Sequence, residues 1–292
     1  MSNLLGSEAG RLSCVDEASP LHEKSLTLAQ KAVVGNAKPA LQRGDGGYAD
    51  WVIVSIHGLK TYLDLPYRRL LDVLYEMPRI GRFLDLEPSE LPDFTTVCTR
   101  MQELKMPIWR RLLRLSAELH DTGEIQAIDA TGMDRIAASQ HYAKRTNYTF
   151  RAVKTTVLID CETGVILDIR CSMKQPHDTQ IAWQLLTRNL DKLSVLTADK
   201  GYDWELLRQK LRSEGVKPVI KHREFGWHGV ANNVLLDDTT YHQRSNIEAT
   251  FFALRRKYGE NVRARTWFGQ FRELVLKCAV RNTELALDGS NG

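Results

Sequence analysis

The chain has 292 residues, of which 43% are hydrophobic and 26% are charged, and its formal net charge is +4. This composition is that of a globular protein with one or two domains, and the mild positive charge permits a nucleic-acid partner without requiring one. No apolar run approaches the roughly 18 residues of a membrane span, so we expect no membrane-spanning segment.

The five cysteines are scattered along the chain and form no CxxC pair. An odd and scattered set argues against a disulfide framework or a zinc site and suits a reducing compartment. The N-terminus also lacks the basic-then-apolar pattern of a secretory signal. We therefore expect a cytoplasmic protein.

Residues 1–47 show little sustained periodicity and end in the linker-like stretch RGDGG, so we predict a partly disordered segment there. Residues 48–120 are predicted to be helical. Asp93 is placed to cap a short helix within 91–104, and Pro107 to begin a longer one. A short helix, a turn and a longer helix resemble a helix-turn-helix, and the alternative is a plain helical bundle.

From residue 124 the pattern changes to that of an α/β domain, which we assign to residues 121–288. Short apolar runs and helical stretches follow one another in this order: strand 126–130, a hairpin of strands 150–160 and 165–171, helix 179–190, strand 195–199, helix 203–214, strand 216–220 and a long helix. Pro218 places the last strand at a sheet edge. The order predicts a ribonuclease-H-like mixed sheet flanked by helices, after an N-terminal helical domain.

Two aspartates, Asp129 and Asp199, each end an apolar strand of this sheet. Ligands of open α/β sheets gather beyond strand ends, and carboxylate oxygens suit magnesium or manganese. Taken singly, each could instead be a cap or a turn residue. Asp134 and Asp203 are weaker alternatives because they lie past the strand ends, and Asp203 is expected to cap a helix.

A third acid lies in a basic helix predicted for 241–259. At about 100° per residue, Tyr241, Arg244, Glu248 and Arg255 fall within about 60° of one another, so Glu248 is the middle of a polar stripe. The alternative is an ordinary Arg244–Glu248 salt bridge on a solvated face.

Four motifs carry a resemblance to a known family. They are PDFTT (92–96), KQPHDTQ (174–180), LTADKGYD (196–203) and Tyr-x2-Arg-x3-Glu-x6-Arg (241–255). Together they resemble the DDE transposases of insertion sequences, over about residues 50–285. The last motif is similar to the Tyr-x2-Arg-x3-Glu-x6-Lys signature of the group related to insertion sequence five. Arg255 departs from that signature, although Lys257 lies two residues further on.

The resemblance implies an activity. Asp129, Asp199 and Glu248 would hold two Mg²⁺ or Mn²⁺ ions about 3.5–4 Å apart. One ion would activate a water and later a 3′-hydroxyl for attack on phosphorus, and the other would stabilise the leaving oxygen. The reactions would be strand cleavage at the ends of an insertion sequence and strand transfer into target DNA.

The expected partner is double-stranded DNA, both terminal inverted repeats and target. Tyr241, Arg244, Arg255 and Lys257 are the predicted DNA contacts. Two basic segments suit phosphate binding. Residues 244–281 contain nine Lys or Arg and three Asp or Glu, and residues 135–154 contain five Lys or Arg and no acid. A homodimer on DNA is expected because transposition joins two ends. The sequence contains no Walker-type phosphate loop, so no ATP-driven partner is implied. We expect the protein to be nucleoid-associated.

Two other functions remain open from the sequence. One is a nuclease of the same fold that cuts DNA without strand transfer. The other is a catalytically inactive DNA-binding repressor, against which the three acids argue. The resemblance also puts His177 and Asp178 near the site, although a structural His–Asp pair is an alternative.

Overall fold

The computed structural model describes residues 20–33, 39–42, 47–135, 152–173 and 176–288. The chain divides into two compact units. The first comprises residues up to Leu119 together with those from Leu274 onwards, and the second runs from His120 to Glu273. The sequence assigned 121–288 to one domain. The structure instead groups the last turns of the final helix with the N-terminal helices.

The first unit is built from helices. Residues 20–32 form a helix, and the later elements are α2 (Asp50–Leu63), α3 (Tyr67–Glu76), α4 (Pro78–Phe83), η1 (Pro88–Glu90), α5 (Phe94–Glu103) and α6 (Met106–Ala117), beside a small β1–β2 pair (Leu41–Gln42 and Gly47–Tyr48). The helix at 20–32 is unexpected from the sequence. It buries Leu21, Leu28 and Ala29, so apolar packing stabilises it despite its weak periodicity.

Local signals in this unit work as the sequence indicated. The Asp93 carboxylate accepts the N–H groups of Thr95 and Thr96 and so caps α5. Pro107 lies in the first turn of α6, where its missing N–H costs nothing. The last turns of α13 (Trp267–Asp288) belong here because Asn282 donates to the Ser116 hydroxyl of α6 and both residues are fully buried.

The second unit is centred on a sheet that has six strands in the described part of the chain. These are β3 (Ile125–Arg135), β4 (Val153–Asp160), β5 (Ile166–Ser172), β6 (Val195–Ala198), β7 (Lys217–Ile220) and β8 (Asn261–Val262). The order is β5-β4-β3-β6-β7, with β8 on the far end of β3. The first three strands are antiparallel and β3, β6 and β7 are parallel. The predicted mixed sheet is confirmed, and so is the edge position of Pro218.

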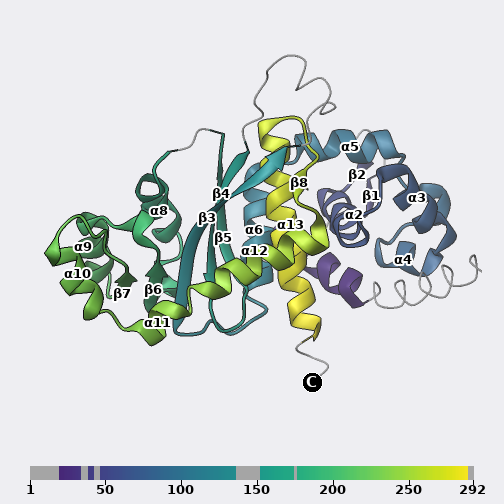
Figure 1. Ribbon diagram of the computed structural model, residues 1–292. Coiled ribbons are helices and arrows are strands. Elements are labelled where there is room, and N and C mark those ends of the chain that lie inside the picture. The colour runs from purple at the N-terminus through teal and green to yellow at the C-terminus, as the bar shows by residue number, and fades with distance from the viewer. Residues whose placement is uncertain (1–19, 34–38, 43–46, 136–151, 174–175, 289–292) are drawn as a thin grey trace, which may run out of the picture. The chain divides into compact units, whose positions relative to one another are not determined.

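Helices cover this sheet (Figure 1). The helices of this unit are α8 (Asp178–Leu186), α9 (Glu205–Ser213), α10 (Trp227–Val234), which buries no residue, α11 (Asp238–His242) and α12 (Ser245–Tyr258), with 3₁₀ turns η2 (Leu190–Lys192) and η3 (Lys200–Tyr202). Helix α8 packs on β4 and β5, α9 on β7, and α12 on β3. Across the residues described, no helix has the length and apolarity that a membrane crossing requires.

Candidate active site

The register of two parallel strands brings Asp129 and Asp199 together. Ile128 of β3 pairs with Ala198 of β6, so the two aspartates lie one residue beyond that pair on neighbouring strands. β6 ends there, as predicted for Asp199. β3 instead continues to Arg135 because β4 still pairs with it. Asp129 is therefore inside its strand, and the prediction that it ends a strand is wrong.

Glu248 lies in the first turn of α12, which is not continuous with the preceding helix. The chain forms α11, then tightens through 3₁₀-type bonds from the Arg244 N–H to the Tyr241 carbonyl and from the Ile247 N–H to the Arg244 carbonyl. The single helix predicted for 241–259 is therefore wrong at its start. Tyr241 belongs to α11, and Arg244 is the N-cap residue directly before α12.

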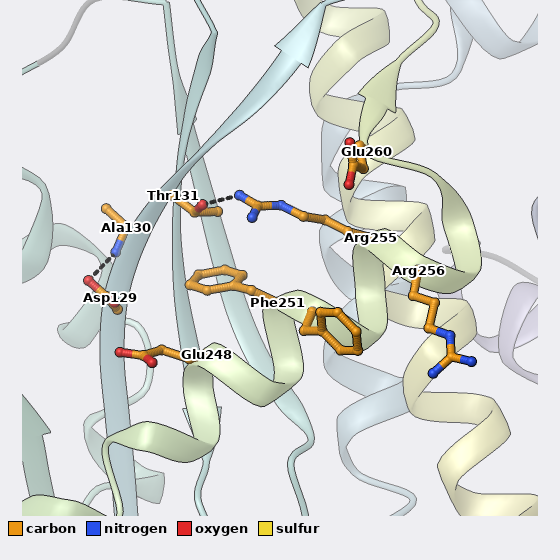
Figure 2. Close-up of a pocket in the computed structure, with 9 residues that line it drawn as sticks. Asp129, Ala130, Thr131, Glu248, Phe251, Arg255, Arg256 and Glu260 are labelled. Atoms are coloured by element: carbon orange, nitrogen blue, oxygen red, sulfur yellow. Dashed lines mark hydrogen bonds between the residues drawn. The ribbon is translucent and has the colours of Figure 1, made fainter.

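Arg244 links the acids of the strand and the helix. Its Nη1 is 3.7 Å from Oδ2 of Asp129, and its Nη2 is 3.1 Å from Oε1 of Glu248. Figure 2 shows Glu248 pointing from α12 toward Asp129 on β3. The predicted alternative, an i,i+4 Arg–Glu pair, is thus present as well, but the same guanidinium also faces Asp129. Glu248 is therefore directed at Asp129, although most of its side chain is exposed.

The environment of Asp129 disfavours a negative charge. The pKa of Asp129 is raised to about 6, because burial and the charges of Asp199 and Asp178 together outweigh the Ala130 N–H and Arg244, which lower it. Burial alone would lower the pKa of Arg244, but Tyr241, Asp129 and Glu248 raise it. Several carboxylates lie close together here and one is half-buried, so nearby positive charge is needed to keep them all ionised.

A pocket of about 460 Å³ opens between α12 and β3. Asp129 and Glu248 are on its wall, with Ala130, Thr131, Phe251, Phe252, Arg255, Arg256 and Glu260. Arg255 reaches across it to β3, where its Nη2 donates to the Thr131 hydroxyl and to the Gly132 carbonyl at 3.0 Å. The pocket thus joins Asp129 and Glu248 at one end to Arg255, Arg256 and Glu260 at the other.

Two other predicted DNA contacts, Tyr241 and Lys257, do not line this pocket. The Tyr241 ring lies between two cations, with Lys221 Nζ at 5.5 Å and the Arg244 guanidinium at 6.0 Å from its centroid. Lys257 is exposed near the end of α12 and is not on the pocket wall. Most of the predicted basic segment 135–154 lies outside the described residues.

The weaker acid candidates lie elsewhere. Asp134 is exposed on β3, five residues beyond Asp129. Asp203 does not cap α9, whose N-cap is Trp204, so that prediction is wrong. It accepts the Arg223 N–H at 2.7 Å and pairs with Arg208 at 2.6 Å. Partial burial raises its pKa, but these hydrogen bonds outweigh burial and lower it. Asp203 is thus engaged in structure.

Two residues outside the three predicted catalytic acids lie beside Asp199, and the resemblance puts one of them, Asp178, near the site. Asp178, in the first turn of α8, forms an ion pair with Lys154 of β4 at 2.7 Å. Tyr202, in η3, is fully buried. A signal for both existed, because each lies within a quoted family motif. His177, by contrast, is exposed and makes no side-chain cap on α8.

The sequence also matches a known protein family. A model of the transposase DDE domain matches residues 120–283, more than half of the chain. The chain belongs to the transposase DDE domain family. It is therefore a transposase that acts on DNA, and the predicted DDE transposase is confirmed.

A solved transposase has a similar fold. The structure described as the piggyBac transposase synaptic complex with hairpin DNA matches with a TM-score of 0.50 at 9% identity, over 92% of this chain and 72% of that chain. At this identity the likeness extends to the fold alone. The family membership itself rests on the match over 120–283.

Asp129, Asp199 and Glu248 offer carboxylate oxygens, the ligands that a divalent cation such as Mg²⁺ prefers. Among the residues described, no group of three or more His, Cys, Asp or Glu is assembled closely enough to hold a metal ion. The predicted full convergence is therefore not seen. The donor chemistry does fit, because Asp129 and Asp199 adjoin one another with Glu248 facing Asp129. Tyr202 also leaves a buried hydroxyl without a hydrogen-bond partner beside these acids.

Proposed function

We propose that this transposase cuts and joins DNA at the ends of an insertion sequence of the group related to insertion sequence five. Asp129, Asp199 and Glu248 are its catalytic carboxylates. The observation that carries the proposal is the adjacency of Asp129 and Asp199 one residue past a parallel strand pair, with Glu248 directed at Asp129 from α12. This adjacency supports the proposal of a ribonuclease-H-like sheet with a catalytic helix beside it.

The three carboxylates would hold two Mg²⁺ or Mn²⁺ ions, which supply an activated nucleophile and neutralise the leaving oxygen. Asp129 is half-buried on a rigid strand, so its position is fixed before substrate arrives. Glu248 is more exposed and lies on a helix turn, so it completes the set by a small movement. Arg244 is the counter-ion that must release Asp129 and Glu248 for this.

The positive groups around the pocket are the proposed DNA contacts. Arg244, once released from the acids, is placed to bind the phosphate next to the scissile bond, with Tyr241 packed against it. Arg255 and Lys257 extend the positive charge along α12. Arg255 is held by β3 through two hydrogen bonds, which orients a guanidinium fork suited to phosphate oxygens.

The helices before residue 120 are the proposed end-recognition domain. α5 and α6 are separated by Leu104 and Lys105 alone, a spacing compatible with a helix-turn-helix. Arg111 and Arg114 are exposed on α6 and would face DNA phosphates. Because transposition joins two ends, we propose that two copies act together on DNA, without ATP.

The test is strand cleavage and joining by the purified full-length protein. The substrate is DNA that carries the inverted repeats flanking the gene, with Mg²⁺ or Mn²⁺ present. We expect nicking and joining by the wild type and a loss of at least about 10³-fold in both steps for Asp129→Asn, Asp199→Ala or Glu248→Gln. DNA binding should persist in all three variants, and EDTA should abolish both steps.

The matched control is Asp134→Asn, which removes an exposed carboxylate from the same strand as Asp129 and should leave both steps intact. Activity that survives Asp129→Asn but not Asp134→Asn would overturn the assignment of residues. Cleavage without joining would favour the nuclease. Specific binding without any metal-dependent cleavage would favour the repressor.

A further inference from the structure

Asp178, which is not one of the three catalytic carboxylates proposed above, lies next to Asp199. A β-carbon placed on Gly201 would lie 2.8 Å from Oδ1 of Asp199 and 3.4 Å from Oδ2 of Asp178. Both oxygens therefore lie within 3.4 Å of one point, although they come from different elements. The absence of a side chain at residue 201 leaves that point open. Asp178 and Asp199 thus face a shared small space.

A buried hydroxyl lies beside the same acids. Tyr202 is 0% exposed, and its Oη has no hydrogen-bond partner among the residues described. Burial raises the pKa of Tyr202, and the charges of Asp178, Asp129 and Asp199 raise it further, so its hydroxyl is near all three. A buried hydroxyl without a partner is costly, which indicates that a state exists in which it donates a hydrogen bond.

A different cation pairs with Asp178 than with Asp129 and Glu248. Lys154 Nζ is 2.7 Å from Oδ1 of Asp178 and donates to the Pro176 carbonyl at 2.8 Å. Arg244 lies against Asp129 and Glu248. Like charges that approach one another in a half-buried site need such neutralisation. The two cations account for why the acids are close without forming an assembled ligand group.

We propose that Asp178 is a fourth carboxylate of the cation centre, sharing one divalent ion with Asp199, and that the Tyr202 hydroxyl orients this pair by donating a hydrogen bond to it. The inference rests on the proposed metal-dependent function. The ion class is a hard divalent cation with oxygen ligands, Mg²⁺ or Mn²⁺. Lys154 then acts as the internal counter-ion that gives up Asp178 when the ion binds.

The first test measures Mn²⁺ binding to the full-length protein by calorimetry, without DNA and without an activity readout. We expect Asp178→Asn to weaken Mn²⁺ binding by about tenfold or more. Lys154→Met should strengthen binding, because it frees the Asp178 carboxylate. Asp238→Asn is the matched control, since Asp238 is also in the first turn of a helix but is exposed, and it should bind as the wild type does.

A second variant keeps the inference testable if Asp178→Asn folds poorly. Tyr202→Phe removes only the hydroxyl, so the metal-free protein should melt at the wild-type temperature or above. The rise in melting temperature caused by saturating Mn²⁺ should be smaller than in the wild type. A purely structural hydroxyl would give the opposite pattern, with a lower melting temperature and an unchanged Mn²⁺ effect.

Failure of this inference is distinguishable from failure of the proposed function. If Asp129→Asn abolishes Mn²⁺ binding while Asp178→Asn and Tyr202→Phe leave it unchanged, the fourth carboxylate is wrong and the three-carboxylate centre stands. If the wild type binds no Mn²⁺, the fourth-carboxylate inference is overturned, and the cleavage and joining assay then decides the proposed function separately.

Discussion

At the scale of single residues, the charge balance of the site depends on Arg244. Its single positive charge faces both Asp129 and Glu248 and offsets part of their mutual repulsion, so the acids can approach one another before any cation binds. The spacing in the sequence predicts the Arg244–Glu248 pair, because i,i+4 residues meet on a helix. It does not predict the burial of Asp129 or the buried hydroxyl of Tyr202. Both depend on which elements pack over them, and one sequence does not carry that information.

The raised pKa of Asp129 leads to a prediction about stability. The folded protein holds this proton up to a pH of about 6, above the ordinary value of 3.8, so ionisation destabilises the fold as pH rises through that interval. In EDTA at pH 7.5, Asp129→Asn should therefore be more stable than the wild type, by about 1 to 3 kcal/mol. The gain should vanish below about pH 4, where the carboxyl is protonated in both states.

Thermal unfolding at the two pH values measures this directly. Asp134→Asn, on the exposed part of the same strand, should change neither value. If Asp129→Asn is less stable than the wild type at pH 7.5, the Arg244 contact outweighs burial, and our account of this carboxyl is incorrect.

At the scale of elements, the site is formed by β3, which is longer than its apolar run, and by α12, which is separated from α11 by a break in the helix. The sequence predicts a strand at 126–130, but β3 runs on to Arg135 through the polar residues that follow Asp129. Its partner β4 supplies the pairing, and long-range pairing is not visible in local periodicity. The break before α12 is equally hidden, because Gln243 and Arg244 keep helical backbone angles while their hydrogen bonds shift to i→i+3.

Arg255 ties α12 to β3, and its replacement tests that link. Lysine is the residue at this position in the signature that residues 241–255 resemble. Arg255→Lys should keep the charge but lose at least one of the two hydrogen bonds to Thr131 and Gly132. We expect amide exchange in α12 to speed up by roughly fivefold. The salt dependence of DNA binding should be unchanged, since the charge remains.

Hydrogen exchange with mass spectrometry would follow α12 peptides in the variant. The neighbouring exposed Arg256→Lys serves as the control and should exchange like the wild type. Equal exchange in both variants would mean that the Arg255 hydrogen bonds do not hold the helix against the strand.

At the scale of the whole molecule, the order of the strands β3 to β7 and of the helices between them is predicted by the sequence, and with it the mixed sheet, whereas α10, α11 and β8 are not. The apolar run that ends at Asp199 and the glycine at 215 mark where β6 and α9 stop, but the parallel register of β3 and β6 is known only from the structure. The division into units was not readable in full. The helix Trp267–Asp288 has one continuous pattern, yet its residues from Leu274 group with the first unit because they bury apolar side chains there.

The central claim is that Asp129, Asp199 and Glu248 form one cation centre. The most direct measurement is anomalous diffraction from crystals of the full-length protein grown with Mn²⁺ and DNA ends. We predict anomalous peaks between the carboxylates of Asp129 and Asp199, with Glu248 drawn in and Arg244 moved from Asp129 to a DNA phosphate. Crystals that contain Mn²⁺ elsewhere, while Arg244 still contacts Asp129 and Glu248, would contradict the account.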